Sequence, residues 1–205
     1  MIYASRAKVD CFIIPEGETR INFSIILGCT EANSAAICPP SDEPIMLVLS
    51  TPKDFKNFSK NSEKKSIPKV LAIEWIEPFF TAGHWIPQMI EFAGGINLIS
   101  KTGEHSRRMD IDEVMNSKPD IIIFMPCGFD TDRTVQEYES ILHNNPAWNS
   151  LQAVKNNQIY AVDANSFFSK PSIRTIDGLE ILAKIIHPEK FKNLIVPDNS
   201  FSKIS

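Results

Sequence analysis

Three strand-like segments, rich in apolar and β-branched residues, determine the fold that we expect for this chain. They cover residues 70–75, 121–125 and 159–162, and each is followed by a loop and then by a segment with helical periodicity. The middle segment is an unbroken apolar run, which is typical of a strand covered on both faces in a parallel sheet. Strands that alternate with helices predict a three-layer α/β fold with a mostly parallel sheet between helices.

The segments between these strands carry the helical periodicity. In residues 85–93 the apolar positions recur at helical spacing, and Gly94 follows as a stop signal. Asp110 and Glu113 match a capping box at the start of a short helix. Helices are therefore expected at residues 85–93, 110–115, 130–142, 148–154 and 172–186.

The chain divides into three parts of unequal regularity. Residues 1–67 are expected to be an irregular N-terminal remnant ending in a linker helix, with a candidate strand at 21–27 and a short buried strand or helical turn at 44–49. Residues 68–192 contain the alternating strands and helices and form the predicted ligand-binding lobe. Residues 193–205 show no clear period and are expected to be a loose C-terminal tail.

Composition and charge exclude several classes of function. The 205 residues carry a formal net charge of −4, which provides no basic surface for a nucleic acid. No apolar run reaches the roughly 20 residues of a transmembrane helix, and the N-terminus lacks the pattern of a secretory signal, which leaves a cytoplasmic location open. The four cysteines form no C-x-x-C pair, so separate thiols are expected, with a Cys29–Cys38 bridge as the alternative in an oxidising compartment.

The loops after the three predicted strands are unusually rich in Phe, Trp, Gly and Pro. They cover residues 74–84, 126–130 and 163–171. In an open parallel sheet, ligands bind outside the carboxyl ends of the strands, so these loops should meet at one edge and accept a large, flat, partly apolar ligand. The candidate ligand-binding residues are Phe79, Phe80, Gly83, His84, Trp85, Cys127, Gly128, Phe129, Asp163, Phe167, Phe168 and Arg174.

Several of these residues also have simpler interpretations. One phenylalanine of each doublet can face the core, because neighbouring side chains alternate in direction. Cys127 lacks a Cys–His signature, which favours a small pocket side chain over a nucleophile. His84 has no H-x-x-H partner, which favours a ligand contact over metal binding. Asp163 and Arg174 can form an ordinary salt bridge or act as helix-end charges.

Three stretches, occurring in this order, resemble a known family: EWIEPFFTAGHWIPQMIEFAGG, PDIIIFMPCGFD and IYAVDANSFFSKPSIRTIDGLEILAKIIHP. They are similar to the C-terminal lobe of substrate-binding proteins of the cobalamin and iron-siderophore ABC importers, and most similar to the cobalamin-binding branch. The resemblance covers residues 68–190.

The resemblance implies a bilobal, monomeric binding protein that is not an enzyme and has no cofactor of its own. It implies that cobalamin or a related corrinoid is held in a cleft between two lobes and delivered to a permease outside the cytoplasmic membrane. Asp112 matches the position where family members place an acidic residue that docks to the permease, and Glu113 is its equivalent if the register shifts by one.

The chain departs from the family at its N-terminal end. Residues 1–50 are too short for a first lobe and a connecting helix, so the N-terminal lobe is expected to be truncated and the cleft to have one wall. The alternatives are an iron-siderophore or haem-binding protein of the same fold, a member that no longer functions, and a small α/β enzyme that uses Cys127 or His84.

Overall fold

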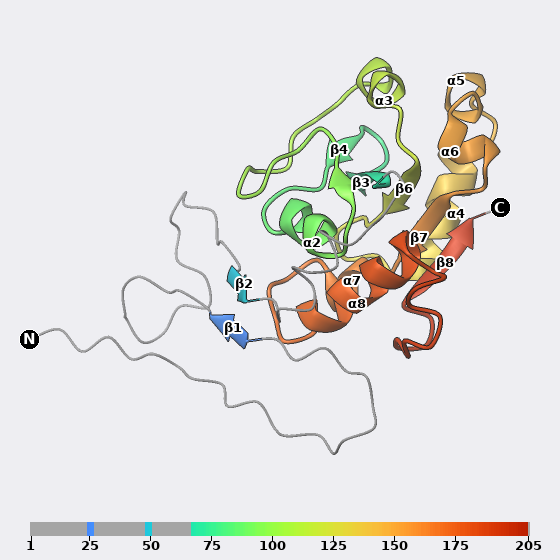
Figure 1. Cartoon of the computed structure of the whole chain (residues 1–205). Coiled ribbons are helices and arrows are strands. Elements are labelled where there is room, and N and C mark those ends of the chain that lie inside the picture. The colour runs from blue at the N-terminus through green and yellow to red at the C-terminus, as the bar shows by residue number, and fades with distance from the viewer. Residues whose placement is uncertain (1–23, 27–47, 51–66, 205) are drawn as a thin grey trace, which may run out of the picture.

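The computed structural model describes residues 24–26, 48–50 and 67–204 (Figure 1). Strands β1 (Ser24–Ile26) and β2 (Val48–Ser50) pair antiparallel, with Ser24 opposite Ser50. Both strands overlap the apolar runs from which strands were expected. The predicted helix near residues 51–65 and the Cys29–Cys38 bridge lie outside the described residues.

A larger sheet forms the centre of the lobe, in the order β4-β3-β6-β7-β8. The neighbouring strands β3, β6 and β7 run parallel to one another. The short strand β5 pairs in parallel with the start of β3, on the side of β3 opposite to β6. β4 and β8 run antiparallel to their neighbours at the two edges. The strands are β3 (Lys69–Trp75), β4 (Phe80–Thr81), β5 (Ile96–Asn97), β6 (Ile121–Phe124), β7 (Ile159–Val162) and β8 (Phe201–Ile204).

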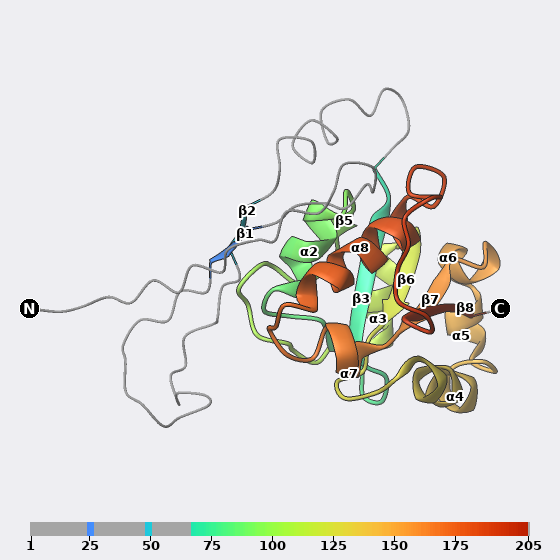
Figure 2. The same cartoon turned by 90° about the horizontal axis from the view of Figure 1, so that it is seen from below.

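Helices cover both faces of this sheet (Figures 1 and 2). One face is covered by α2 (Ile86–Phe92), α7 (Ala164–Phe167) and α8 (Thr175–Ile186). The other face is covered by α3 (Ile111–Ser117), α4 (Thr131–Ile141), α5 (Pro146–Asn149) and α6 (Gln152–Lys155).

Successive side chains of β3 point to opposite faces of the sheet and pack into the core on each face. Val70 and Ala72 enter the core beneath α2 and α8, whereas Leu71 and Ile73 enter the core on the opposite face. All four are buried, as expected for a central parallel strand. The three-layer α/β fold predicted from the sequence is confirmed.

Two sequence predictions at the C-terminal end are wrong. Residues 201–204 are not part of a loose tail: they form β8, in which Lys203 pairs with Tyr160 of β7. This edge strand has four residues, of which only Ile204 is buried. Its alternation of apolar and polar residues is therefore too short to be recognised as a strand in the sequence. The last helix begins at Thr175, which leaves Ile173, expected on its apolar face, 70% exposed in the preceding loop.

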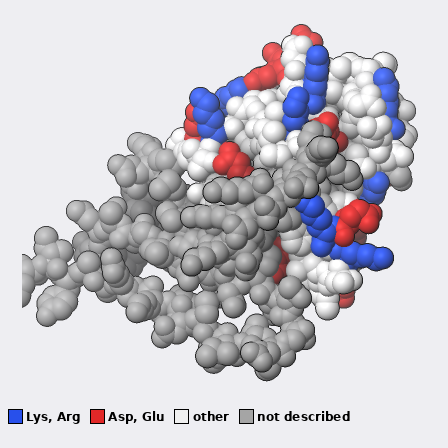
Figure 3. All heavy atoms as spheres, in the orientation of Figure 1, with Lys and Arg blue, Asp and Glu red and all other residues white. Residues whose placement is uncertain are grey.

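The surface shows charges of both signs. On the face presented in Figure 3, basic and acidic side chains are interspersed over the described part, and neither sign forms a broad continuous area. Among the described residues, no helix has the length and apolar character needed to cross a membrane.

Candidate functional site

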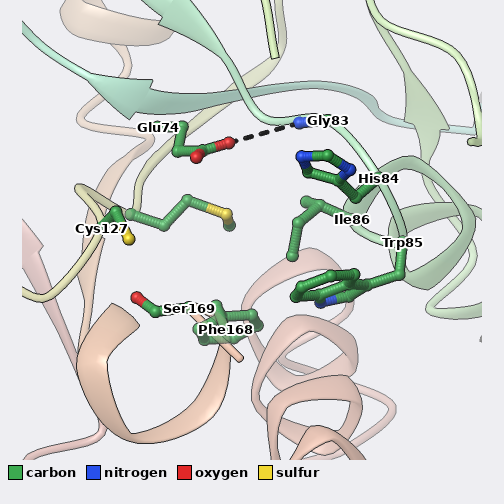
Figure 4. Close-up of a pocket in the computed structure, with 9 residues that line it drawn as sticks. Glu74, Gly83, His84, Trp85, Ile86, Cys127, Phe168 and Ser169 are labelled. Carbon is green, nitrogen blue, oxygen red and sulfur yellow. Dashed lines mark hydrogen bonds between the residues drawn. The ribbon is translucent and has the colours of Figure 1, made fainter. Parts of the chain in front are cut away.

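A pocket of about 160 Å³ opens at the carboxyl edge of the sheet (Figure 4). Its walls come from the end of β3, the connection from β4 to α2, the loop after β6 and the loop after α7. The nine residues that line it are Glu74, Gly83, His84, Trp85, Ile86, Met125, Cys127, Phe168 and Ser169. The three strand ends that the sequence predicted to converge therefore meet around one pocket.

Backbone groups tie these strand ends together. The Cys127 amide donates to the Glu74 carbonyl oxygen at 3.3 Å, which joins the loop after β6 to the end of β3. The Gly128 amide donates to Ser169 Oγ at 3.0 Å, which joins the same loop to the one after α7. Gly128 adopts a φ of 80°, in the left-handed region that glycine accepts without a steric cost. The pocket walls are thus fixed relative to one another.

The segment around His84 is held by a second partner, the loop of residues 103–109. The Thr81 amide donates to the Arg107 carbonyl at 2.9 Å. Further along, the His84 amide donates to the Glu104 carbonyl at 2.6 Å, and the Gly103 amide donates to the His84 carbonyl at 2.8 Å. The two segments therefore lie side by side, and the backbone at His84 is bonded through both of its polar groups.

Gly83 is required by this close approach. A Cβ at Gly83 would lie 2.4 Å from the Ser106 amide nitrogen and 2.7 Å from the Glu104 carbonyl oxygen. Both are backbone atoms, which cannot rotate away. His84 follows with a φ of 57°, an uncommon conformation for a residue with a side chain, and such strain is typical of functional loops.

Aromatic rings form one wall of the pocket. The ring centroids of His84 and Trp85 lie 5.7 Å apart, and His105 meets His84 edge-on at 5.0 Å. The Trp85 Nε1–H group is buried and has no hydrogen-bond partner among the described residues. Phe168 belongs to the core beneath α8 and also reaches the pocket.

Glu74 supplies the charge of the pocket. Its Oε2 atom accepts a hydrogen bond from the Ser106 hydroxyl and a longer one, at 3.4 Å, from the Gly83 amide (Figure 4). None of the nine lining residues is a lysine or an arginine. The pocket therefore combines apolar and aromatic surface with one carboxylate.

The structure places three of the four phenylalanines of the two doublets away from the pocket lining. Phe79 stacks on Trp148 at 5.9 Å in the core on the opposite face of the sheet, so it is a core residue. Phe167 is 8% exposed within the core beneath α8. Phe80 is partly buried in β4 and does not line the pocket. One phenylalanine of the second doublet, Phe168, lines the pocket.

Four other candidates do not line the pocket: Gly128, described above, and Phe129, Asp163 and Arg174. Phe129 is buried between Trp75, whose ring it meets at 5.3 Å, and Arg133, whose guanidinium carbon lies 3.8 Å from its centroid. The Asp163 side chain caps α7 by accepting a hydrogen bond from the Ser166 backbone amide. Arg174 is exposed at the start of α8, and its guanidinium has no partner among the described residues, so the suggested pair with Asp163 does not form.

Sequence reasoning missed four lining residues: Glu74, Ile86, Met125 and Ser169. Glu74 carried a usable signal, because it follows Val70 and Ala72 at alternate positions and is the first charge in the apolar run of β3. That spacing places it on the face that bears α2 and α8.

The pocket contains side chains that can bind a metal, although the described residues form no complete metal site. In the described part of the chain, no cluster of three or more His, Cys, Asp or Glu side chains is arranged to hold a free metal ion. The pocket nevertheless contains the His84 imidazole, the exposed Cys127 thiol and the Met125 thioether. Each of these groups can serve as a single axial ligand to a metal that a macrocycle already holds.

The two acidic residues of α3 differ in their environments. Glu113 forms a two-pronged ion pair with Arg107, in which Nη1 lies 3.1 Å from Oε2. The hydrogen bond from Arg107 lowers the pKa of the Glu113 carboxyl. The Glu113 backbone amide donates to the Asp110 side chain. Of the two hydrogen bonds in the predicted capping box, this is the one that forms. Asp112 is exposed.

Fold and pocket together define a class of protein: an α/β lobe with a pocket at the carboxyl edge of its sheet. Residues 59–166, more than half of the chain, match the family of periplasmic binding proteins, and the chain belongs to this family. Members of this family bind transported ligands and are neither enzymes nor carriers of a resident cofactor, in agreement with the sequence-based expectation.

Individual relatives agree with this assignment. The high-affinity heme uptake system protein IsdE of Staphylococcus aureus (strain MRSA252) is 26% identical over 135 residues, which cover 64% of this chain and 46% of IsdE. The structure of the TroA-like periplasmic binding protein FepB from Veillonella parvula superposes with a TM-score of 0.58 at 18% identity, covering 75% of this chain and 56% of FepB. The periplasmic vitamin B12 binding protein BtuF of Vibrio cholerae gives 0.51 at 19% identity, covering 67% and 50%. The chain spans about half the length of the relatives it matches.

Proposed function

We propose that this lobe is the ligand-binding wall of a substrate-binding protein of an ABC uptake system, and that its ligand is a metal-bearing tetrapyrrole. Cobalamin or a related corrinoid is the first choice. The observation that carries the proposal is the pocket at the sheet edge, where Trp85 and Phe168 offer apolar ring surface beside the metal-ligating groups of His84 and Cys127. Like other members of its family, the protein would act outside the cytoplasmic membrane.

The size of the pocket fits one wall of a cleft. Pockets that enclose a ligand of drug size measure about 300–1,000 Å³. The pocket of about 160 Å³ holds part of a macrocycle and leaves the rest for a second wall. The lobe alone should therefore bind more weakly than a complete cleft.

The charge of the pocket favours a corrinoid. Glu74 is its only charged lining residue, and a corrin ring carries amide groups around its edge, which donate hydrogen bonds to a carboxylate. The vitamin B12 binding protein BtuF is one of the structural neighbours. An anionic siderophore favours basic residues in the cleft, and none of the nine lining residues is a lysine or an arginine.

Haem is the second candidate, and the curated relative IsdE favours it. Its iron accepts an axial His or Cys ligand, and the pocket offers one of each in His84 and Cys127. If His84 is the axial ligand, His84→Ala should shift the haem absorption band and Cys127→Ala should not. The reverse result would identify Cys127 as the ligand.

Titration with cyanocobalamin and with hemin tests the function. Trp85 lies in the pocket, whereas Trp148 is fully buried on the opposite face of the sheet. Binding should quench the emission of Trp85, so Trp85→Phe should lose most of the signal. Trp75→Phe is the matched control, because Trp75 is 37% exposed and does not line the pocket. No binding of either ligand up to about millimolar concentration, a free energy of about −4 kcal/mol, would refute the proposal.

We propose further that Asp112 is the residue that meets the permease. Asp112 is exposed, whereas the Glu113 carboxylate is occupied by Arg107. Asp112→Lys should abolish co-sedimentation with liposomes that carry a cobalamin-type ABC permease. Asp132→Lys, at another exposed site at the start of α4, should not. Equal loss in both variants would assign the effect to overall charge.

A further inference from the structure

We propose that Glu74 selects the chemistry of the ligand's periphery: it favours a macrocycle that presents N–H donors, such as amides, and rejects one that presents a carboxylate at this position. This inference rests on the proposed tetrapyrrole function and specifies the substrate class of the same pocket.

The position of Glu74 is set by the fold. It stands at the end of β3, at a position that alternates with Val70 and Ala72, and it lies in the wall of the pocket. The Ser106 hydroxyl and the Gly83 amide both donate to its Oε2 atom, so the side chain is held in one orientation. The carboxylate is thus built into the pocket wall instead of moving freely in solvent.

Its remaining hydrogen-bonding capacity is directed at a ligand. A carboxylate has about four acceptor sites on its two oxygens. Both described partners use Oε2, and Oε1 has no partner among the described residues. In Figure 4 the carboxylate lies in the pocket wall and points toward Gly83, to which it is hydrogen-bonded. An N–H group of a ligand would complete its hydrogen bonds, with the added strength of a charged acceptor.

A ligand carboxylate would meet the opposite situation. None of the nine lining residues is a lysine or an arginine, so the wall of this pocket carries no permanent positive charge to compensate two carboxylates brought together. Like charges at short range repel more strongly in a partly buried pocket than in water. Glu74 therefore discriminates between two macrocycles of the same shape whose edges differ in charge.

Matched ligand pairs test this inference. The first pair is cyanocobalamin and its derivatives in which one propionamide is hydrolysed to a carboxylate; the second is iron protoporphyrin IX and its diamide. Dissociation constants come from tryptophan quenching at neutral pH and low salt. The wild-type protein should bind the amide member of a pair at least about tenfold more tightly, which corresponds to about 1.4 kcal/mol.

The variant Glu74→Gln isolates the charge. Its amide oxygen can still accept from Ser106 and Gly83, so the loop stays anchored while the charge is lost. The preference should fall to about one, mainly because the carboxylate ligand binds more tightly. Glu77→Gln, an exposed residue after the same strand, is the matched control and should keep the wild-type preference.

Each outcome decides a separate point. A wild-type protein that binds both members of each pair equally well overturns the role of Glu74, whether or not the variant folds. An unchanged preference in a folded Glu74→Gln variant, checked by circular dichroism, overturns it as well. Failure of the wild type to bind any of these ligands instead overturns the proposed tetrapyrrole function, and the selectivity of Glu74 with it.

Discussion

Replacing Gly83 by alanine should destabilise the lobe and displace the histidine that follows. The added Cβ would lie 2.4 Å from the Ser106 amide nitrogen and 2.7 Å from both the Glu104 oxygen and the His105 carbonyl carbon. Contacts below 3.0 Å with backbone atoms cannot be relieved by a side-chain rotation. The loop of residues 103–109 must therefore move away from the segment that carries His84.

The size of the effect follows from the contacts that the movement disturbs. Overpacking at a well-packed site costs about 1–3 kcal/mol. Lengthening the two hydrogen bonds that join His84 to Glu104 and Gly103 costs about 0.5–1.5 kcal/mol for each one lost. A total of about 2–6 kcal/mol is therefore expected if both bonds are lost, which for a slope of about 2 kcal/mol per molar urea lowers the unfolding midpoint by about 1–3 M.

Urea denaturation followed by circular dichroism measures this change, and Gly128→Ala is the matched comparison. At Gly128 a Cβ would meet no atom within 4 Å, but φ is 80°, so only the backbone conformation costs energy, about 1–2 kcal/mol. Gly83→Ala should also weaken ligand binding, because it moves His84 and Trp85. A loss of less than about 0.5 kcal/mol for Gly83→Ala, the size of an ordinary surface change, would refute the reasoning.

Three further predictions concern the core and the pH dependence. Phe168→Ala should cost about 3–5 kcal/mol and weaken ligand binding, since Phe168 is 4% exposed and belongs to both the core and the pocket; equal affinity in a folded variant would remove it from the site. Trp148→Phe should cost about 1–3 kcal/mol in urea denaturation, because the Tyr138 hydroxyl loses the indole N–H that donates to it at 3.2 Å; an unchanged midpoint would contradict this. Burial lowers the pKa of His187, whose Nε2 lies 3.0 Å from the Gly94 carbonyl, so the folded state favours the neutral ring. Stability should be fully present above the ordinary pKa of about 6.5 and decline as the pH falls below it, and a thermal unfolding series from pH 7.5 to 5 should show a weaker decline for His187→Gln than for the wild type.

The central strands were predictable because their signal is local. Strand β7 spans Ile159–Val162, as expected, and β6 spans Ile121–Phe124, one residue shorter than its apolar run. Both strands are buried along their whole length, so each residue reports its environment directly in the sequence. The carboxyl ends of parallel strands meet at one edge, which is why the three pocket loops could also be predicted from the order of elements alone.

The finer features depend on partners far along the chain. Nothing in the segment after Phe79 shows that its ring stacks on Trp148, because that contact follows from the placement of α5 on the far face of the sheet. The pairing of residues 79–84 with residues 103–109 joins two segments without regular periodicity. The local pattern of β3 places Glu74 on the face that bears α2 and α8, but the anchoring of its carboxylate by Ser106 and the need for glycine at position 83 depend on that pairing.

The hydrogen bonds between the pocket loops have a consequence for how such a site can change through evolution. The backbone amides of Cys127 and Gly128 donate these hydrogen bonds. The acceptor for Cys127 is the Glu74 backbone carbonyl, and the acceptor for Gly128 is the Ser169 hydroxyl. Substitution of the Cys127 side chain therefore leaves the scaffold in place while altering the surface that a ligand meets. A lobe built in this way can acquire a new preference one residue at a time, without passing through an intermediate that has lost its fold.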